Sequence, residues 1–216
     1  RAADILDNLP VGTPFNWVDE VSINLTTQML ATLFDFPFAE RHKLTLWSDN
    51  FTSGSPRHDV EGRKAREQIM LECLDYFEAL WHRRKAESAN GFDLITMMQR
   101  DPTAANMIED PIEYLGTLGL LIVGGNDTTR NSLTGGVLAL NQNPKEYEKL
   151  RANHGLIHSL VPETLRWQTP PLPLRPPSLA GATLGAQPIP HGAQLVPRHT
   201  TGNRVPPLST PSDGLT

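Results

Sequence analysis

The longest regular pattern of apolar residues lies in the middle of the chain. Asp110 precedes Pro111, and Glu113 follows Asp110 by three residues, which is the arrangement of an N-cap, a first-turn proline and a capping-box acid. Apolar side chains then recur at helical spacing up to the Asn143-Pro144 pair, namely at Ile112, Leu115, Leu118, Ile122, Leu133, Val137 and Leu140. The pattern predicts one helix of about thirty residues, roughly 45 Å long at 1.5 Å per residue.

The centre of this helix is apolar on successive faces. Residues 120–123 are all apolar, so this part of the helix is expected to be buried on nearly all sides. The uninterrupted apolar run, residues 118–123, is far shorter than the roughly 17 residues that a membrane span requires. A transmembrane helix is therefore not expected.

Two glycines, an acid and an alcohol follow the apolar run. Gly124 and Gly125 each cost a helix about 1 kcal/mol relative to alanine, but they leave a patch of backbone that a flat or bulky group can approach. Asp127 and Thr128 lie just beyond this gap. An acid next to a hydroxyl is suited to passing protons to a bound reactant, so Asp127 and Thr128 are the candidate catalytic residues.

The rest of the chain up to residue 169 also favours helices. Helical spacing of apolar residues predicts further helices at 14–34, 39–47, 63–85, 92–99, 145–152 and 155–168. In the helix at 63–85 the residues expected to face inward are Ile69, Leu74, Phe77, Leu80 and Trp81. No alternating strand pattern appears before Pro170, so the fold class is predicted to be mainly α.

The composition changes at residue 170. Eleven of the 19 prolines lie between Pro170 and Thr216, and no aromatic residue follows Trp167. Such a segment cannot build much core. The predicted organisation is a helical core at 1–169 followed by a proline-rich β or irregular segment at 170–216.

Charge and cysteine content exclude some functions. The net charge of −5 and the pI near 5.8 argue against a nucleic-acid partner. A single cysteine excludes a disulfide framework and indicates a reducing compartment, for which we expect the cytoplasm. The basic run at 82–85 is interpreted as a solvated helix end, with docking of an acidic redox partner as the alternative.

The histidines do not form a recognisable metal motif. His154 and His158 lie four residues apart, but no His-Glu-x-x-His pattern is present and Gly155 weakens a helix between them. We interpret them as two surface histidines and predict no metal ligand in this chain.

Two motifs resemble those of a known family. Residues 124–129, Gly-Gly-Asn-Asp-Thr-Thr, resemble the oxygen-activation motif in the long central helix of the cytochrome P450 superfamily. Downstream, Glu163-Thr164-Leu165-Arg166 resembles the Glu-x-x-Arg motif of the same superfamily. The stretches 25–38, 124–140 and 166–170 look like the bacterial alkane and fatty-acid terminal hydroxylases, and the resemblance covers roughly residues 14–170.

This resemblance implies a cytochrome P450 fold fragment and a haem-dependent monooxygenase. It would hydroxylate linear alkanes or fatty acids at the terminal carbon, with dioxygen and with electrons from NAD(P)H through a ferredoxin reductase and a ferredoxin. Gly124 and Gly125 would leave room over the haem (haem b, with its iron), Asp127 would relay protons, and Thr128 would hydrogen-bond the bound oxygen. The family uses the Glu163 and Arg166 positions to fix the scaffold behind the haem. The remaining polar positions, Asn126 and Thr129, are expected to support the helix.

The chain also departs from the family. The family ligates haem iron through a Cys thiolate after the Glu-x-x-Arg helix, whereas the only cysteine here is Cys73, which lies mid-helix between Glu72 and Asp75. Those carboxylates are expected to raise the pKa of its thiol and oppose a ligand role. We therefore expect an internal fragment that is inactive by itself, an expectation in keeping with its start at Arg1.

The family's propionate contact is only half matched. Arg175 occupies the first of two adjacent basic positions that contact a haem propionate in the family, and Pro176 occupies the second. The family pattern returns at residues 201–204, Thr-Gly-Asn-Arg, which resemble a Ser-Gly-Asn-Arg stretch.

Three other interpretations of these residues lead to different functions. Asp127 and Thr128 could simply cap a helix after a glycine break. A nucleotide-binding α/β domain predicts a Gly-x-Gly-x-x-Gly or Gly-Lys-Ser loop, and neither occurs. An all-α binding module without redox chemistry would use the long helix to bind a partner or an apolar ligand.

Overall fold

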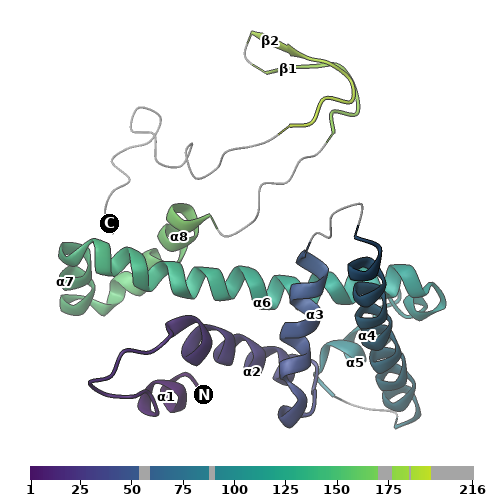
Figure 1. The fold of residues 1–216 in the computed structure, drawn as a ribbon, viewed down its shortest axis with the longest axis horizontal. Coiled ribbons are helices and arrows are strands. Elements are labelled where there is room, and N and C mark those ends of the chain that lie inside the picture. The colour runs from purple at the N-terminus through teal and green to yellow at the C-terminus, as the bar shows by residue number, and fades with distance from the viewer. Residues whose placement is uncertain (54–58, 88–90, 170–176, 185, 196–216) are drawn as a thin grey trace. The chain divides into compact units, whose positions relative to one another are not determined.

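The structure, a computed structural model, describes residues 1–53, 59–87, 91–169, 177–184 and 186–195 and is mainly helical (Figure 1). The chain forms two compact units, residues 1–130 and 131–216, and the helix α6 (Pro111–Gln142) runs from the first into the second. The first unit also contains α1 (Ala2–Asp7), the π-helix η1 (Val18–Ile23), α2 (Asn24–Leu33), the 3-10 helix η2 (Phe38–Glu40), α3 (His42–Thr52), α4 (Val60–Ala86), α5 (Leu94–Arg100) and the 3-10 helix η3 (Met107–Glu109). The second contains α7 (Pro144–Ala152), the 3-10 helix η4 (His154–Leu156), α8 (Ile157–Gln168), β1 (Ala182–Leu184) and β2 (Gln187–Ile189).

The long helix begins and ends where the sequence predicts. The Oδ1 atom of Asp110 accepts hydrogen bonds from the backbone N–H groups of Ile112 at 3.0 Å and Glu113 at 3.1 Å, which satisfies two of the free donors at the helix start. The helix ends at Gln142, directly before the Asn143-Pro144 pair. The predicted helix is therefore confirmed, at 32 residues.

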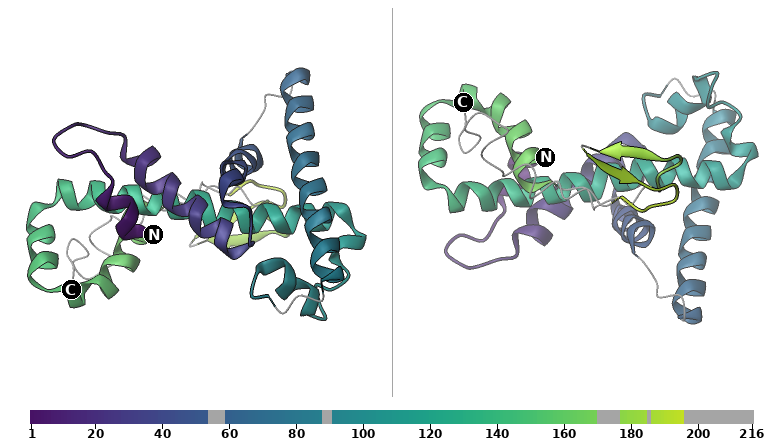
Figure 2. Two further views of the ribbon diagram at one scale, coloured as in Figure 1. Left: turned by 90° about the horizontal axis from the view of Figure 1, so that it is seen from below. Right: turned by 90° about the horizontal axis from the view of Figure 1, so that it is seen from above.

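The hydrophobic core of the first unit is centred on α4. Four of the five residues predicted to face inward, Leu74, Phe77, Leu80 and Trp81, are buried, and Ile69 is partly buried. The Trp81 ring lies edge-on to Tyr114 of α6 with ring centroids 5.4 Å apart, and the Tyr114 hydroxyl donates a hydrogen bond to the Phe77 carbonyl at 3.1 Å. Aromatic pairs of this kind add to the stabilisation from burial alone. The Trp81–Tyr114 ring contact and the Tyr114 hydrogen bond hold α4 against the first part of α6 (Figure 2).

The helix predicted at 14–34 is present but irregular. It consists of the π-helix η1 followed without a break by α2. After α2 the chain turns at Asp35, whose φ of 47° lies in the left-handed region. The N–H of Phe36 donates to the Ala31 carbonyl at 2.7 Å and the N–H of Asp35 to the Thr32 carbonyl at 3.2 Å, which is the Schellman arrangement that ends many helices.

The expectation that the centre of α6 is buried on nearly all sides is wrong for the described residues. Apart from Gly119 and Gly135, the buried residues of α6 are Tyr114, Leu118, Ile122 and Asn126, which recur every fourth position and form a single face. Leu120, at the centre of the apolar run, is 74% exposed. Within the first unit, one face of α6 packs against α2, α3 and α4, and another face is open at Gly116, Leu120 and Gly124.

The second unit consists of packed helices and a small β-hairpin. Gly135 lies close to α8, since a Cβ there would be 2.5 Å from the side chain of Gln168. β1 and β2 pair antiparallel, with Thr183 opposite Pro188, so a small sheet follows the helices as predicted (Figure 2). Pro162 lies inside α8. The predicted domain boundary between residues 169 and 170 stays a prediction.

None of the helices in the described part of the chain combines the length and apolar character that a membrane span needs.

Candidate active site

The two glycines of the candidate motif have different surroundings. A Cβ built on Gly124 would meet nothing within 4 Å, so the backbone there faces open space. A Cβ on Gly125 would lie 2.6 Å from the Cδ2 atom of Leu30, a buried residue of α2. Gly125 therefore allows α2 to approach α6 closely, and Gly124 is the position that leaves room for a ligand.

This difference predicts opposite effects of alanine. Gly125→Ala is expected to lower the free energy of unfolding by about 1–2 kcal/mol, because the methyl group overpacks against Leu30. Gly124→Ala is expected to raise it by up to about 1 kcal/mol, because alanine favours the helix and nothing opposes its methyl group. Urea denaturation of both variants measures the two effects, and equal effects would contradict the assignment of Gly125 to helix packing.

Thr128 follows Gly124 by one helical turn. Its Oγ1 hydroxyl donates a hydrogen bond to the Gly124 carbonyl at 2.8 Å. Such a bond to the carbonyl four residues earlier is common for threonine in helices and fixes the side-chain rotamer. The hydroxyl is thereby held beside the open position at Gly124.

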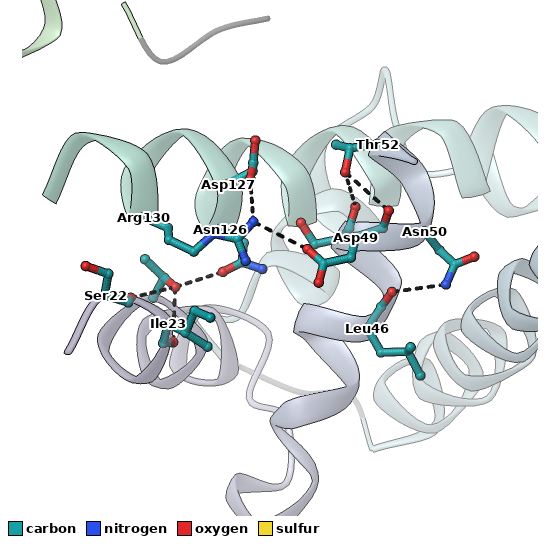
Figure 3. A network of polar contacts seen from close by, with 11 residues as sticks. Ser22, Ile23, Leu46, Asp49, Asn50, Thr52, Asn126, Asp127 and Arg130 are labelled. Atoms are coloured by element: carbon teal, nitrogen blue, oxygen red, sulfur yellow. Dashed lines mark hydrogen bonds and ion pairs between the residues drawn. The ribbon is translucent and has the colours of Figure 1, made fainter. Parts of the chain in front are cut away.

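Asp127 is held by an arginine on its own helix. The Nη2 atom of Arg130 lies 2.5 Å from Oδ1 of Asp127 and 3.4 Å from Oδ1 of Asp49, near the end of α3 (Figure 3). The side chains of Arg130 and Asp127 are only 15% and 18% exposed, whereas that of Asp49 is 54% exposed. Sequence reasoning identified Asp127 but missed Arg130 and Asp49. Positions 127 and 130 have the spacing of a helical ion pair, so Arg130 could have been predicted from the sequence.

Asn126 ties α6 to α2 from the buried face. Its Oδ1 atom accepts a hydrogen bond from the Thr26 hydroxyl at 2.8 Å, and both side chains are almost completely buried. Its Nδ2 atom has no partner among the described residues. The expected supporting role of Asn126 therefore takes a definite form, a polar link within an apolar helix contact.

Loss of the Thr26–Asn126 hydrogen bond is expected to lower the free energy of unfolding measurably. Thr26→Val removes the hydroxyl and leaves Asn126 Oδ1 buried without its partner, so the free energy of unfolding is expected to fall by about 1–3 kcal/mol. Thr27→Val is the matched control, because Thr27 is also buried on α2 but its hydroxyl bonds, among the described residues, to the preceding turn of the same continuous helix, at the carbonyls of Ile23 and Asn24. Equal losses for the two variants in urea denaturation would contradict a specific Thr26–Asn126 contribution.

Glu163 and Arg166 form the expected pair on α8. Nε of Arg166 donates to Oε2 of Glu163 at 2.7 Å, and Nη2 donates to Oε1 at 2.6 Å. This two-bond geometry is the strongest form of an arginine and carboxylate interaction. The pairing on one helix face is thus present, and its role behind a haem stays a prediction.

Cys73 does not have the properties of a metal ligand. It is completely buried in the core of the first unit, and burial, with a smaller contribution from the Glu72 charge, raises the pKa of its thiol to about 12. The sequence prediction had the direction right but named the carboxylates as the cause, whereas desolvation dominates.

His154 and His158 are both exposed, as their interpretation as surface histidines predicts. Within the described ranges no group of three or more histidine, cysteine or acidic side chains could hold a metal ion, and His154 and His158 lie in η4 and α8. The predictions for Arg175 and for residues 201–204 lie outside the described residues.

The proteins that are similar in sequence to this chain agree with one another, although no protein-family model matches the chain. Cytochrome P450 126 of Mycobacterium tuberculosis is 30% identical over 99% of this chain and 52% of its own length. Linalool 8-monooxygenase of Pseudomonas putida is 28% identical over 94% of the chain and 50% of its own length. The chain thus spans about half the length of the curated relatives that it matches.

Solved structures agree with these relatives. Cytochrome P450-153 from Novosphingobium aromaticivorans is 38% identical, with a TM-score of 0.86 over 100% of this chain and 51% of that structure. CYP153D17 from Sphingomonas sp. PAMC 26605 is also 38% identical, with a TM-score of 0.80 over 99% of this chain and 53% of that structure.

Proposed function

Because the chain belongs to the cytochrome P450 superfamily, we propose that it is the part of a haem-dependent monooxygenase that covers one face of the haem and delivers protons there. The observation that carries this proposal is the open face of α6, which ends at the acid and alcohol of the candidate motif.

The residues of this face fit a flat apolar cofactor. Gly116, Leu120 and Gly124 are exposed and follow one another at intervals of four, so they form one row along α6. A Cβ at Gly116 or Gly124 would meet nothing within 4 Å, and Leu120 between them presents an exposed apolar side chain. A haem ring is flat and largely apolar, so this row is suited to lie against it.

The chemistry divides between the cofactor and the protein. The haem, when bound, supplies the activation of dioxygen. Thr128, held beside Gly124, offers a hydroxyl to the reacting oxygen, and Asp127 exchanges protons with solvent and passes them inward. Gly124, rather than Gly125, provides the room for oxygen and substrate.

The iron ligand must come from another cysteine. Burial and a pKa near 12 keep the Cys73 thiol protonated and out of reach of a cofactor. We therefore place the thiolate in a part of the protein that this chain does not include, so the chain alone would not catalyse the reaction.

The proposed substrate is a linear alkane or a fatty acid, oxidised at its terminal carbon. The 38% identity to cytochrome P450-153 and CYP153D17 supports the resemblance to the alkane hydroxylase group. Relatives at 28% and 27% identity are named linalool 8-monooxygenase and steroid C26-monooxygenase, so terpenoid and steroid substrates are the competitors to exclude. Electrons would come from NAD(P)H through a ferredoxin reductase and a ferredoxin, in the cytoplasm.

The test uses the full-length protein that contains this chain. It is expected to purify with haem, to give the carbon monoxide difference spectrum of a haem thiolate, and to convert a linear alkane or fatty acid to its terminal hydroxy product with NAD(P)H and redox partners. Linalool and a steroid are assayed in parallel. A preference for either of these would overturn the substrate proposal, and a folded protein that binds no haem would favour the all-α binding module instead.

A further inference from the structure

The acid of the candidate site is not free in this structure. Arg130 lies one helical turn after Asp127, and its Nη2 atom contacts Asp127 Oδ1 at 2.5 Å. Exposed ion pairs of this spacing contribute little to stability. This pair is different, because both side chains are more than four-fifths buried and the guanidinium is directed at the proposed proton carrier.

The same nitrogen also reaches a second carboxylate. Oδ1 of Asp49 lies 3.4 Å from Arg130 Nη2, so one guanidinium is shared between two acids (Figure 3). The contact with Asp127 is the shorter of the two. If the charge of Asp49 were removed, Asp127 would be the one carboxylate of this pair still bound to Arg130.

Asp49 lies near the C-terminal end of α3, which packs against α6. The Phe51 ring occupies the space that a side chain at Gly119 would need, so the last turn of α3 lies directly on α6. Asp49 lies in that turn, and its carbonyl accepts the N–H of Ser53 at 2.9 Å, just after α3 ends. A shift of this turn would therefore change the distance from Asp49 to Arg130.

We propose that Arg130 is a positioning residue for Asp127, and that Asp49 shares its guanidinium, so that the last turn of α3 sets how firmly the proton carrier is held. This inference rests on the proposed function for the role of Asp127. It adds two residues that would act through Asp127 and would touch neither substrate nor cofactor.

The first experiment replaces Arg130 in the full-length enzyme. Arg130→Ala is expected to lower kcat about tenfold, to leave KM within about twofold and to raise the solvent deuterium isotope effect on turnover, because the carboxylate loses its orientation. Arg130→Lys is expected to recover a large part of kcat, since an ammonium group can still bind Asp127. The matched control is Arg63→Ala, an exposed arginine near the start of α4. An isotope effect and kcat equal to those of the wild type in Arg130→Ala would overturn the positioning role.

The second experiment tests the sharing of the guanidinium. Asp49→Asn is expected to lower kcat about two- to threefold, because Arg130 then holds Asp127 so firmly that its carboxyl group turns less readily between solvent and the site. It is expected to have no such effect in the Arg130→Ala background. Asp75→Asn, an exposed acid on α4, controls for the change in net charge. The same effect of Asp49→Asn in both backgrounds would overturn the shared ion pair.

A third measurement does not depend on catalysis. In thermal unfolding, Asp49→Asn is expected to lower Tm by about 1 °C in the wild-type background and to change it less in the Arg130→Ala background. Additive losses of Tm would contradict the ion pair itself. A wild-type enzyme that lacks haem or hydroxylation would overturn the proposed function and the positioning role with it, whereas an active wild type with an unaffected Arg130→Ala variant would overturn the positioning role alone.

Discussion

The Asp127→Asn variant of the full-length enzyme is expected to turn over about a hundredfold more slowly than the wild type, within the range usual for loss of a group that transfers protons. Asparagine has the same shape, and its amide oxygen can still accept the hydrogen bond from Arg130, so the fold at this position should persist. It cannot take up and release a proton as a carboxyl group does. The measurement is kcat with saturating substrate and redox partners, together with Tm as a check on folding.

The control for Asp127→Asn is Asp75→Asn, which makes the same charge change at an exposed position of α4. Its kcat should stay within about twofold of the wild type, since surface substitutions of this kind are nearly neutral. If the kcat of Asp127→Asn equals the kcat of Asp75→Asn, protons reach the site by another route and Asp127 has no part in the mechanism.

Local signals made the long helix predictable. Asp110 and Pro111 specify its start and Asn143-Pro144 its end, and each acts through the backbone of its immediate neighbours. The Glu163–Arg166 pair was equally readable, because a spacing of three residues on a helix brings the two side chains together wherever the helix lies.

Contacts between distant segments could not be read from the sequence. Asp49 and Arg130 are 81 positions apart, and Leu30 and Gly125 come from different helices. Nothing in a run of two glycines says which one faces a neighbouring helix and which faces open space. The apolar run around Leu120 was misjudged for the same reason, since apolar character indicates a tendency to be covered but not what covers it.

The covered and open faces of α6 explain why its polar residues have separate roles. Asn126 lies on the buried face and bonds to Thr26, so it contributes to helix packing. Gly124 lies on the open face, and the hydroxyl of Thr128 is bonded to its carbonyl. Asp127 lies between these faces, paired with Arg130. Residues 124–128 span four helical steps of about 100° each, which is slightly more than one full turn, so one short motif can serve packing, proton transfer and ligand approach.

Thr128→Ala is expected to separate electron consumption from product formation. NAD(P)H oxidation should stay within about twofold of the wild type, while the terminal hydroxy product formed per NAD(P)H should fall about tenfold or more, because the reacting oxygen loses the hydroxyl held beside Gly124. The missing electrons should appear as hydrogen peroxide, since two electrons and two protons added to dioxygen give that product. Product, peroxide and NAD(P)H are quantified in the same reaction.

Two further variants assign this effect to the hydroxyl. Thr128→Ser keeps an Oγ atom able to donate to the Gly124 carbonyl and removes only the methyl group, so it should retain most of the coupling between NAD(P)H and product. Thr129→Ala changes the neighbouring exposed threonine and should leave coupling unchanged. If Thr128→Ala couples as well as Thr129→Ala, the hydroxyl has no part in proton delivery. In that case its bond to the Gly124 carbonyl would be a helix contact alone, and Asp127 would have to act through another group.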